Sequence, residues 1–339
     1  MAHETAVASG DESVDAICVR LDSKAAAISE IAPRIEQRKI VRSRVSQVIV
    51  ELRSVGLNYF DLRAASGLFP DAQFPRTPGR DYAGVVIAGP SEWIGAEVFG
   101  ASNVMGVFLD GTHASHVVLD AATLVRKPAN LTFDESVGVS LPFGAAASGL
   151  QGPGRPEAGD TALIYPITHA IGHALAQICA WRGVRVIGAL QSGASFHGFT
   201  CAPVELVDPA VADVPTQVAA LTGGRGADFI FNLTAQDAHK SLAPRGRQVF
   251  FWTGDKTVQP NIAEFFKGQH SYVGARFASA SDLEISEILR ELVPGFESGK
   301  LRPFEIANAY VFPLSQAARA YAAVAAVGPS SLVMFDPQR

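Results

Sequence analysis

The stretch that decides the fold is TALIYPITHAIGHALAQICAWRGVRVIGAL, residues 161–190. Its apolar start, residues 162–164, is typical of a strand buried on both faces of a sheet. Apolar residues then recur at helical spacing from Ile171 to Cys179, and Gly183 ends this pattern. A second apolar run, residues 184–189, completes a β-α-β unit. The sequence therefore predicts the beginning of a dinucleotide-binding sheet.

The turn between the first strand and the helix departs from the pattern that such sheets use. Small residues normally stand there, because backbone amides must approach a pyrophosphate closely. This chain has PITHAIG over residues 166–172, and Gly172 alone remains of the expected glycines. The stretch therefore predicts the fold clearly and gives a bound cofactor little support.

The composition indicates a globular chain. Of the 339 residues, 48% are hydrophobic and 18% charged, which leaves room for two domains with their own cores. A net charge of -5 gives nucleic-acid binding little electrostatic support, and no apolar run is long enough to span a bilayer. The polar, acidic N-terminus differs from a signal peptide, so we expect a cytoplasmic protein acting on a small molecule. Three scattered cysteines, Cys18, Cys179 and Cys201, argue against a disulfide framework and a cysteine zinc cluster.

The hydrophobic pattern changes near Leu131. Before it, residues 15–130 show short strands separated by glycine and proline, which favours a small β-barrel. After it, Thr132 and Glu135 form a capping-box pattern, and strands alternate with helices. This alternation predicts a doubly wound parallel sheet with strands opening at Thr161, Val184, Val204, Ala227, Arg247 and Ser271. Ser315 is expected to cap a last helix.

Several phrases, in order along the chain, carry a family resemblance. They include GLNYFDLRAASGLFP (56–70), TPGRDYAGVV (77–86), AGDTALIYPITHAIGHALAQ (158–177) and GKLRPFEIANAYVFPLSQAARAY (299–321). The chain thereby resembles the medium-chain dehydrogenase/reductase superfamily, and within it the zinc-free quinone oxidoreductase and enoyl reductase branch. The resemblance implies a GroES-like barrel of residues 1–130 and 285–339, a Rossmann domain of residues 131–284, and a cleft where they meet. It also implies a homodimer that pairs the last Rossmann strand, near residues 271–277.

The resemblance places three residues where zinc-dependent relatives hold their catalytic metal. Asn58, Arg80 and Asp81 stand there in place of a cysteine and a histidine-glutamate pair. A guanidinium group does not ligate a cation, and zinc needs three or four thiolate, imidazole or carboxylate donors. We therefore predict no metal site. His113 and His116, in an expected strand, point to opposite faces and are interpreted as surface or core residues.

The resemblance also implies NADPH as the cofactor. It assigns the binding residues Thr168, His169, Ala170, Ile171, Gly172, Gln191, Ser192, Asn232 and Trp252. Pro166 has no N–H to donate, and His169 either pairs with phosphate as a cation or fills the space that the phosphate would use. Residues 186–224 contain no Lys or Arg for a 2′-phosphate. The segment 192–203 replaces a regular helix, so it is either a drifted surface loop or a changed adenosine pocket.

The candidate catalytic residues are Asn58, Tyr59, Asp61, Arg80 and His169. Tyr59 is the best acid by its chemistry, with aromatic packing as the alternative, and Asp61 is expected to hold its loop by bonding backbone amides. Phe69 stands where relatives often carry a tyrosine, and it has no proton to donate. Three functions stay open. They are NADPH-dependent reduction of an activated C=C bond or quinone, cofactor-independent lyase, cyclase or isomerase chemistry in the cleft, and binding without catalysis.

Overall fold

The computed structural model describes residues 12–191, 193–234, 238–251, 259, 261–275, 277–305, 310–328 and 332–339. The chain divides into two compact units. The first, here the barrel unit, comprises Met1–Leu141, Ala280–Val293 and Pro303–Arg339, and the second, the sheet unit, comprises Pro142–Ser279 and Pro294–Arg302. The domain limits expected from the sequence, residues 131 and 284, stay a prediction.

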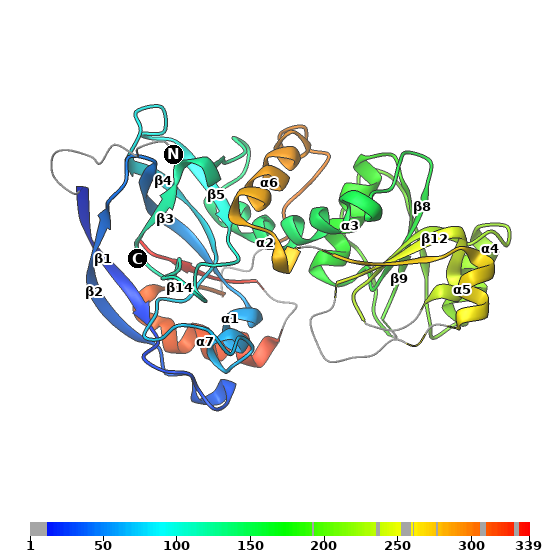
Figure 1. The fold of residues 1–339 in the computed structure, drawn as a ribbon, viewed down its shortest axis with the longest axis horizontal. Coiled ribbons are helices and arrows are strands. Elements are labelled where there is room, and N and C mark those ends of the chain that lie inside the picture. The colour runs from blue at the N-terminus through cyan, green and yellow to red at the C-terminus, as the bar shows by residue number, and fades with distance from the viewer. Residues whose placement is uncertain are drawn as a thin grey trace, which may run out of the picture. The chain divides into compact units, whose positions relative to one another are not determined.

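The sheet unit contains a six-stranded parallel sheet in the order β10-β9-β8-β11-β12-β13 (Figure 1). Its strands are β8 (Thr161–Tyr165), β9 (Arg185–Ala189), β10 (Val204–Val207), β11 (Ala227–Asn232), β12 (Leu242–Phe250) and β13 (Ser271–Gly274). The strand order reverses between β8 and β11, and ligands of such sheets bind beyond the carboxyl ends of the strands at that point. The predicted parallel sheet is confirmed. β12 begins five residues before the expected Arg247, because Leu242 already pairs with Ala227 ahead of an irregularity in the register.

Three helices of the sheet unit connect its strands, and the first of them ends just before the predicted Gly183. They are α3 (Ala170–Trp181), α4 (Val214–Leu221) and α5 (Ile262–Gly268). Gly183, just past α3, has a φ of +78°, a left-handed conformation that glycine adopts at low cost. Two further helices, α2 (Phe133–Gly149) and α6 (Asp282–Glu297), run from one unit into the other, and the change falls at Pro142 and Pro294.

The barrel unit is built from both ends of the chain, as predicted. Its larger sheet has the order β14-β15-β3-β4-β5-β7, and β6 also pairs with β3. The strands are β3 (Gln47–Leu57), β4 (Asp81–Ala88), β5 (Glu97–Ala101), β6 (His116–Asp120), β7 (Val125–Arg126), β14 (Val311–Pro313) and β15 (Val333–Asp336). β1 (Glu12–Arg20) and β2 (Arg34–Arg42) form a separate antiparallel ribbon. Helices α1 (Tyr59–Ala65) and α7 (Ala317–Val327) lie side by side (Figure 1).

Two helix starts test the capping predictions. The Thr132 backbone N–H and hydroxyl donate to Glu135 Oε2 at 2.8 and 2.9 Å ahead of α2, which confirms the capping box. The prediction of Ser315 as a cap is wrong, because α7 begins at Ala317 after the 3₁₀ turn Leu314–Gln316. Leu314 is buried in the core of the barrel unit, and this anchors the extra turn. Within the described part of the chain, no helix is long and apolar enough to cross a membrane.

Candidate functional site

The residues at the expected metal positions are bonded to one another. Asn58 immediately follows β3, and its Nδ2 donates to Asp81 Oδ2 at 2.6 Å. Asp81 opens β4 and is 2% exposed, and a Cβ atom added at Gly56 would lie 2.9 Å from its Oδ2. Burial raises the pKa of Asp81 to about 7; the nearby Asp61 carboxylate acts in the same direction, while Arg80 and Asn58 oppose it. The second oxygen, Oδ1, has no hydrogen-bond partner among the described residues.

Arg80 lies in the same buried cluster and is 4% exposed. Its Nε is 3.6 Å from Asp61 Oδ1, and its guanidinium carbon lies 3.8 Å from the centre of the Phe60 ring. Asp61 Oδ2 accepts the Asn58 backbone N–H at 2.8 Å. Asp61 therefore holds the turn before α1 through a backbone amide, as the sequence predicts, and it also faces the guanidinium group.

Further buried groups extend this cluster. Arg76 is 2% exposed, and burial lowers its pKa, whereas the charge of Asp61 favours the protonated form. His113 lies outside the strand predicted for it and is fully buried, with Nδ1 3.0 Å from the Tyr321 hydroxyl and Nε2 2.9 Å from the Gly56 carbonyl. Burial lowers the pKa of His113, so its imidazole is neutral near pH 7. His113 is therefore a core residue, in line with the interpretation made from the sequence.

Tyr59, the candidate acid, is the first residue of α1. Its side chain is half-buried and packs against the core of the barrel unit. The nearby Phe60 ring contacts Phe69 at a centroid distance of 5.1 Å, and Phe69 contacts Phe108 at 6.2 Å. The structure thus brings Asn58, Tyr59, Asp61 and Arg80 together around the β3–α1 turn, beside a row of phenylalanine rings. Their catalytic roles stay predictions.

The expected pyrophosphate turn belongs to the sheet unit and carries its own cap. His169 is the residue before α3, and its Nδ1 accepts the Ile171 backbone N–H at 3.2 Å. Burial lowers the pKa of His169, so the neutral imidazole is the form that accepts this bond. A Cβ atom added at Gly172 would lie 2.1 Å from the Pro166 carbonyl oxygen, so the glycine is required by the tight β8–α3 turn itself. The imidazole therefore holds one of the amides that a pyrophosphate would use.

The remaining described cofactor candidates lie at the carboxyl ends of neighbouring strands. Thr168 follows β8, Gln191 follows β9, and the Thr168 hydroxyl donates to Gln191 Oε1 at 3.4 Å. Asn232 ends β11, where it pairs with Tyr165 of β8. Ala170 and Ile171 form the first turn of α3. Ser192 and Trp252 lie outside the described residues.

The loop after β9 contains no helix over residues 193–203, as the sequence predicts. It packs on α3 through His173, whose Nε2 is 2.8 Å from the Phe199 carbonyl oxygen. The Phe196 ring meets the His173 ring edge to face at 5.1 Å, and a Cβ atom at Gly198 would lie 2.4 Å from His173 Cε1. The loop is thus a specifically packed element, and His173 is the residue on which it rests.

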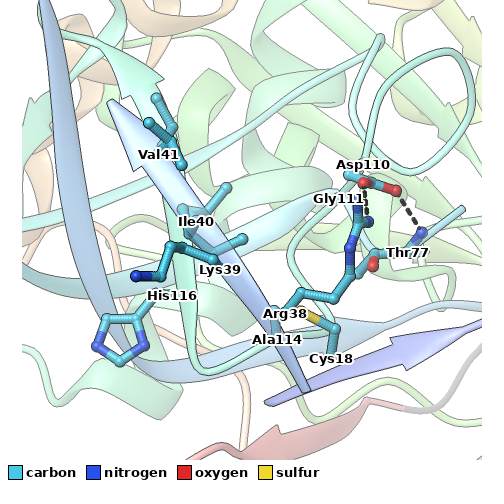
Figure 2. A pocket seen from close by; sticks show the side chains of 12 residues that line it. Cys18, Arg38, Lys39, Ile40, Val41, Thr77, Asp110, Gly111, Ala114 and His116 are labelled. Carbon is cyan, nitrogen blue, oxygen red and sulfur yellow. Dashed lines mark hydrogen bonds and ion pairs between the residues drawn. The ribbon is translucent and has the colours of Figure 1, made fainter. Parts of the chain in front are cut away.

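A pocket of about 200 Å³ opens between β2 and the loop before β6 in the barrel unit (Figure 2). Asp110 lies in its wall, where Oδ2 accepts from Arg38 at 2.5 Å and Oδ1 accepts the Thr77 backbone N–H at 2.7 Å. Burial alone would raise the pKa of Asp110, but these donors together with Arg20 lower it. Cys18 lies in the pocket wall as well, and burial raises the pKa of its thiol. Asp110 is satisfied by Arg38 and the Thr77 amide, so this pocket is a weaker candidate than the cluster around Arg80.

Sequence reasoning missed Arg76 and His173. A buried arginine in a proline-flanked loop leaves no periodic signal, because its burial depends on chain segments distant in sequence. His173 shares the apolar helix pattern with its neighbours, and only the folded loop reveals its contact.

Two protein-family models match parts of this chain. Residues 44–129 match the family model of the alcohol dehydrogenase GroES-like domain, and residues 207–327 match that of a zinc-binding dehydrogenase. In the described part of the chain, no group of three or more His, Cys, Asp or Glu side chains is arranged to hold a metal ion. The absence of zinc stays a prediction.

The chain is similar to proteins from distant organisms. It is 28% identical over 277 residues to a zinc-type alcohol dehydrogenase-like protein of Schizosaccharomyces pombe, covering 79% of this chain and 81% of that protein. It is 25% identical over 293 residues to the quinone oxidoreductase of Pongo abelii, covering 81% and 84%. A solved alcohol dehydrogenase superfamily protein from Novosphingobium aromaticivorans superposes with a TM-score of 0.77 at 26% identity, covering 95% of this chain and 99% of that one.

Proposed function

We propose that this chain, which belongs to the medium-chain dehydrogenase/reductase superfamily, is a zinc-independent reductase of its quinone oxidoreductase and enoyl reductase branch. The reaction is reduction of an activated C=C bond in an enone, an enoyl compound or a quinone. One observation carries the zinc independence. The Asn58 amide bonds Asp81, and a guanidinium group occupies the third ligand position and faces Asp61. An arginine at this position repels a cation and takes up the carboxylate that would balance it.

The proposal needs a hydride donor, and the sheet unit retains part of a dinucleotide cradle. The amides of Ala170, Ile171 and Gly172 open α3 at the strand-order reversal, with Gln191 beside them. These residues fit a pyrophosphate on the condition that the His169 imidazole leaves the Ile171 amide. NADPH, when bound, supplies the hydride. Because residues 186–224 contain no Lys or Arg, NADPH should not gain strongly over NADH.

Within the barrel unit, the residues of the β3–α1 turn would orient the substrate and move the proton. We assign proton donation to the Tyr59 hydroxyl, because Tyr59 lies at this turn and is only partly buried. Asp61 fixes the turn and Asn58 fixes Asp81. Action as a cytoplasmic homodimer belongs to the same proposal.

The cap at α3 favours a second function. If His169 keeps the Ile171 amide, the cradle stays closed and the chain is a redox-inactive member of the fold. It would then act as a lyase, cyclase or isomerase through Tyr59 and Arg80, or bind a ligand without catalysis.

A titration of the full chain with NADPH and NADH, followed by nicotinamide fluorescence and calorimetry, tests the first function. We expect saturable binding of both, a preference for NADPH below about a hundredfold, and NADPH oxidation when a quinone or an enone is added. Saturable nucleotide binding without NADPH oxidation by a quinone or an enone would contradict the proposed reductase activity. If neither NADPH nor NADH binds, the result supports the second, redox-inactive function.

A further inference from the structure

Two buried guanidinium groups in the barrel unit have N–H donors that make no hydrogen bond to the described residues. Arg76 and Arg80 are 2% and 4% exposed. Arg80 Nε and Arg76 Nε and Nη2 have no hydrogen-bond partner among the residues that the structure describes. The Nη1 of Arg76 donates to the Gln73 carbonyl at 3.3 Å. Buried charged donors are costly to leave unpaired, so this arrangement indicates a position for an acceptor.

Aromatic rings hold both groups in place. The guanidinium carbon of Arg80 lies 3.8 Å from the Phe60 ring centre, and that of Arg76 lies 4.2 Å from the Phe74 ring centre. A guanidinium group stacked on a ring keeps its N–H bonds in its own plane, where they remain available to an oxygen. The two forks are therefore preorganised before any ligand arrives.

Two carboxylates lie near these guanidinium groups. The Asp61 carboxylate is 3.6 Å from Arg80 Nε, and its charge also acts on Arg76. Asp81 is the second acid, and burial raises its pKa to about 7. His113 is neutral because burial lowers its pKa. Neither carboxylate accepts a hydrogen bond from Arg76 Nε, Arg76 Nη2 or Arg80 Nε in the part of the chain that the structure describes, so these donors stay open to a further acceptor.

The surroundings indicate what carries the anionic group. The Phe60 ring that supports Arg80 contacts Phe69, and Phe69 contacts Phe108, whose side chain is 42% exposed. A flat conjugated body can stack along such a row, because aromatic rings prefer offset and edge contacts of this kind.

We infer that Arg80 and Arg76 bind a carboxylate, and that the row of Phe60, Phe69 and Phe108 receives the unsaturated or aromatic body attached to it. The ligand class is therefore a conjugated monocarboxylate. That such a ligand is the substrate rests on the proposed function, whereas its binding does not.

Calorimetric titration of the full chain without nicotinamide tests this site, with trans-cinnamate as the probe and its neutral methyl ester as the matched control. The two share one body and differ in the charge. We expect saturable binding of cinnamate, at least about tenfold tighter than the ester, and weaker at high salt. Equal affinities, or no binding of cinnamate to the folded chain, would overturn the inference.

Substitutions locate the contact. Arg80→Lys and Arg76→Lys keep the charge but lose the planar fork, so each should reduce cinnamate affinity about tenfold and leave ester binding unchanged. Arg126→Lys is the matched control, because Arg126 also stacks on a ring, that of Trp93 at 4.8 Å, outside the cluster. Unchanged cinnamate affinity in both cluster variants would overturn the assignment. If a variant does not fold, as circular dichroism would show, the acid and ester comparison in the unaltered chain still decides. Loss of NADPH turnover would contradict only the proposed function, since this titration contains no nucleotide.

Discussion

The resemblance to the superfamily predicts two ligand positions, and the residues at these two positions differ from the family pattern in opposite ways. In the barrel unit, the expected metal positions hold Asn58, Arg80 and Asp81. Asn58 bonds Asp81, while Arg80 Nε and Asp81 Oδ1 have no hydrogen-bond partner among the described residues. In the sheet unit, the turn expected to bind a pyrophosphate holds His169, whose Nδ1 accepts the Ile171 amide. The barrel position therefore retains a donor and an acceptor without hydrogen bonds to the described residues, whereas at the sheet position one amide is already hydrogen-bonded within the chain.

This difference shows that losing a family's ligand residues does not by itself close a site. What matters is whether the buried donors and acceptors left behind find partners within the chain. By that criterion the barrel unit remains ready for a ligand of new chemistry, whereas the sheet unit must first give up an internal bond. Four measurements break or sharpen the comparison.

A large effect is expected from Arg80→Gln. Removing the guanidinium leaves Asp61 and Asp81 buried without their cation, so the free energy of unfolding should fall by about 3 kcal/mol. Denaturant unfolding at neutral pH measures this loss. Adding Asp61→Asn should restore part of it, and the exposed control Arg126→Gln should cost less than about 0.5 kcal/mol. A loss in Arg80→Gln as small as in this control would show that the cluster is not electrostatically coupled.

Asp81→Asn should change how stability depends on pH. Burial raises the pKa of Asp81 to about 7 in the folded chain, against about 4 when unfolded. The folded state then binds the proton more tightly, so the stability of the unaltered chain falls as pH rises from about 4 to about 7 and is flat above. D81N lacks this titration. As pH rises over that range, its free energy of unfolding should increase relative to that of the unaltered chain by up to ~4 kcal/mol. If the unfolding free energies of D81N and the unaltered chain change with pH in the same way, the raised pKa of Asp81 is contradicted.

His169→Gly tests the opposite alteration. Loss of the cap should cost about 1 kcal/mol of unfolding free energy, measured by denaturant. If the imidazole blocks the turn, the same variant should bind NADPH better, though only in part, because Pro166 still offers no N–H. Asp213→Ala is the matched control, since it removes the cap of α4 in the same unit and should leave NADPH binding unchanged. Tight NADPH binding by the unaltered chain that weakens in His169→Gly would show instead that His169 contacts phosphate.

The smallest effect is expected from chelation. Treatment with EDTA should leave the thermal midpoint unchanged, and elemental analysis should find far less than one zinc per chain. This expectation follows from the arginine and asparagine at the ligand positions. A stoichiometric zinc, or a fall of the midpoint in EDTA, would show that other residues complete a metal site.

The sequence by itself determined the architecture, because hydrophobic periodicity is local. The apolar run before Pro166, the helical pattern to Cys179 and the glycine at 183 predict β8 and α3, with ends within two residues of those observed. The departures at Asn58, Arg80 and His169 were also visible, since they replace residues of a pattern read position by position. Ser315 was misjudged because the buried Leu314 adds a turn that capping preferences do not describe.

Only the tertiary structure decided what the departures do. Whether His169 contacts the Ile171 amide depends on a rotamer, and whether Arg80 meets Asp61 depends on the packing of β4 against β3. Arg76 belongs to a loop, and only the folded barrel unit shows that it is buried with two donors that lack a partner among the described residues. Burial and hydrogen-bond satisfaction are properties of segments brought together from distant parts of the chain, and no local pattern encodes them.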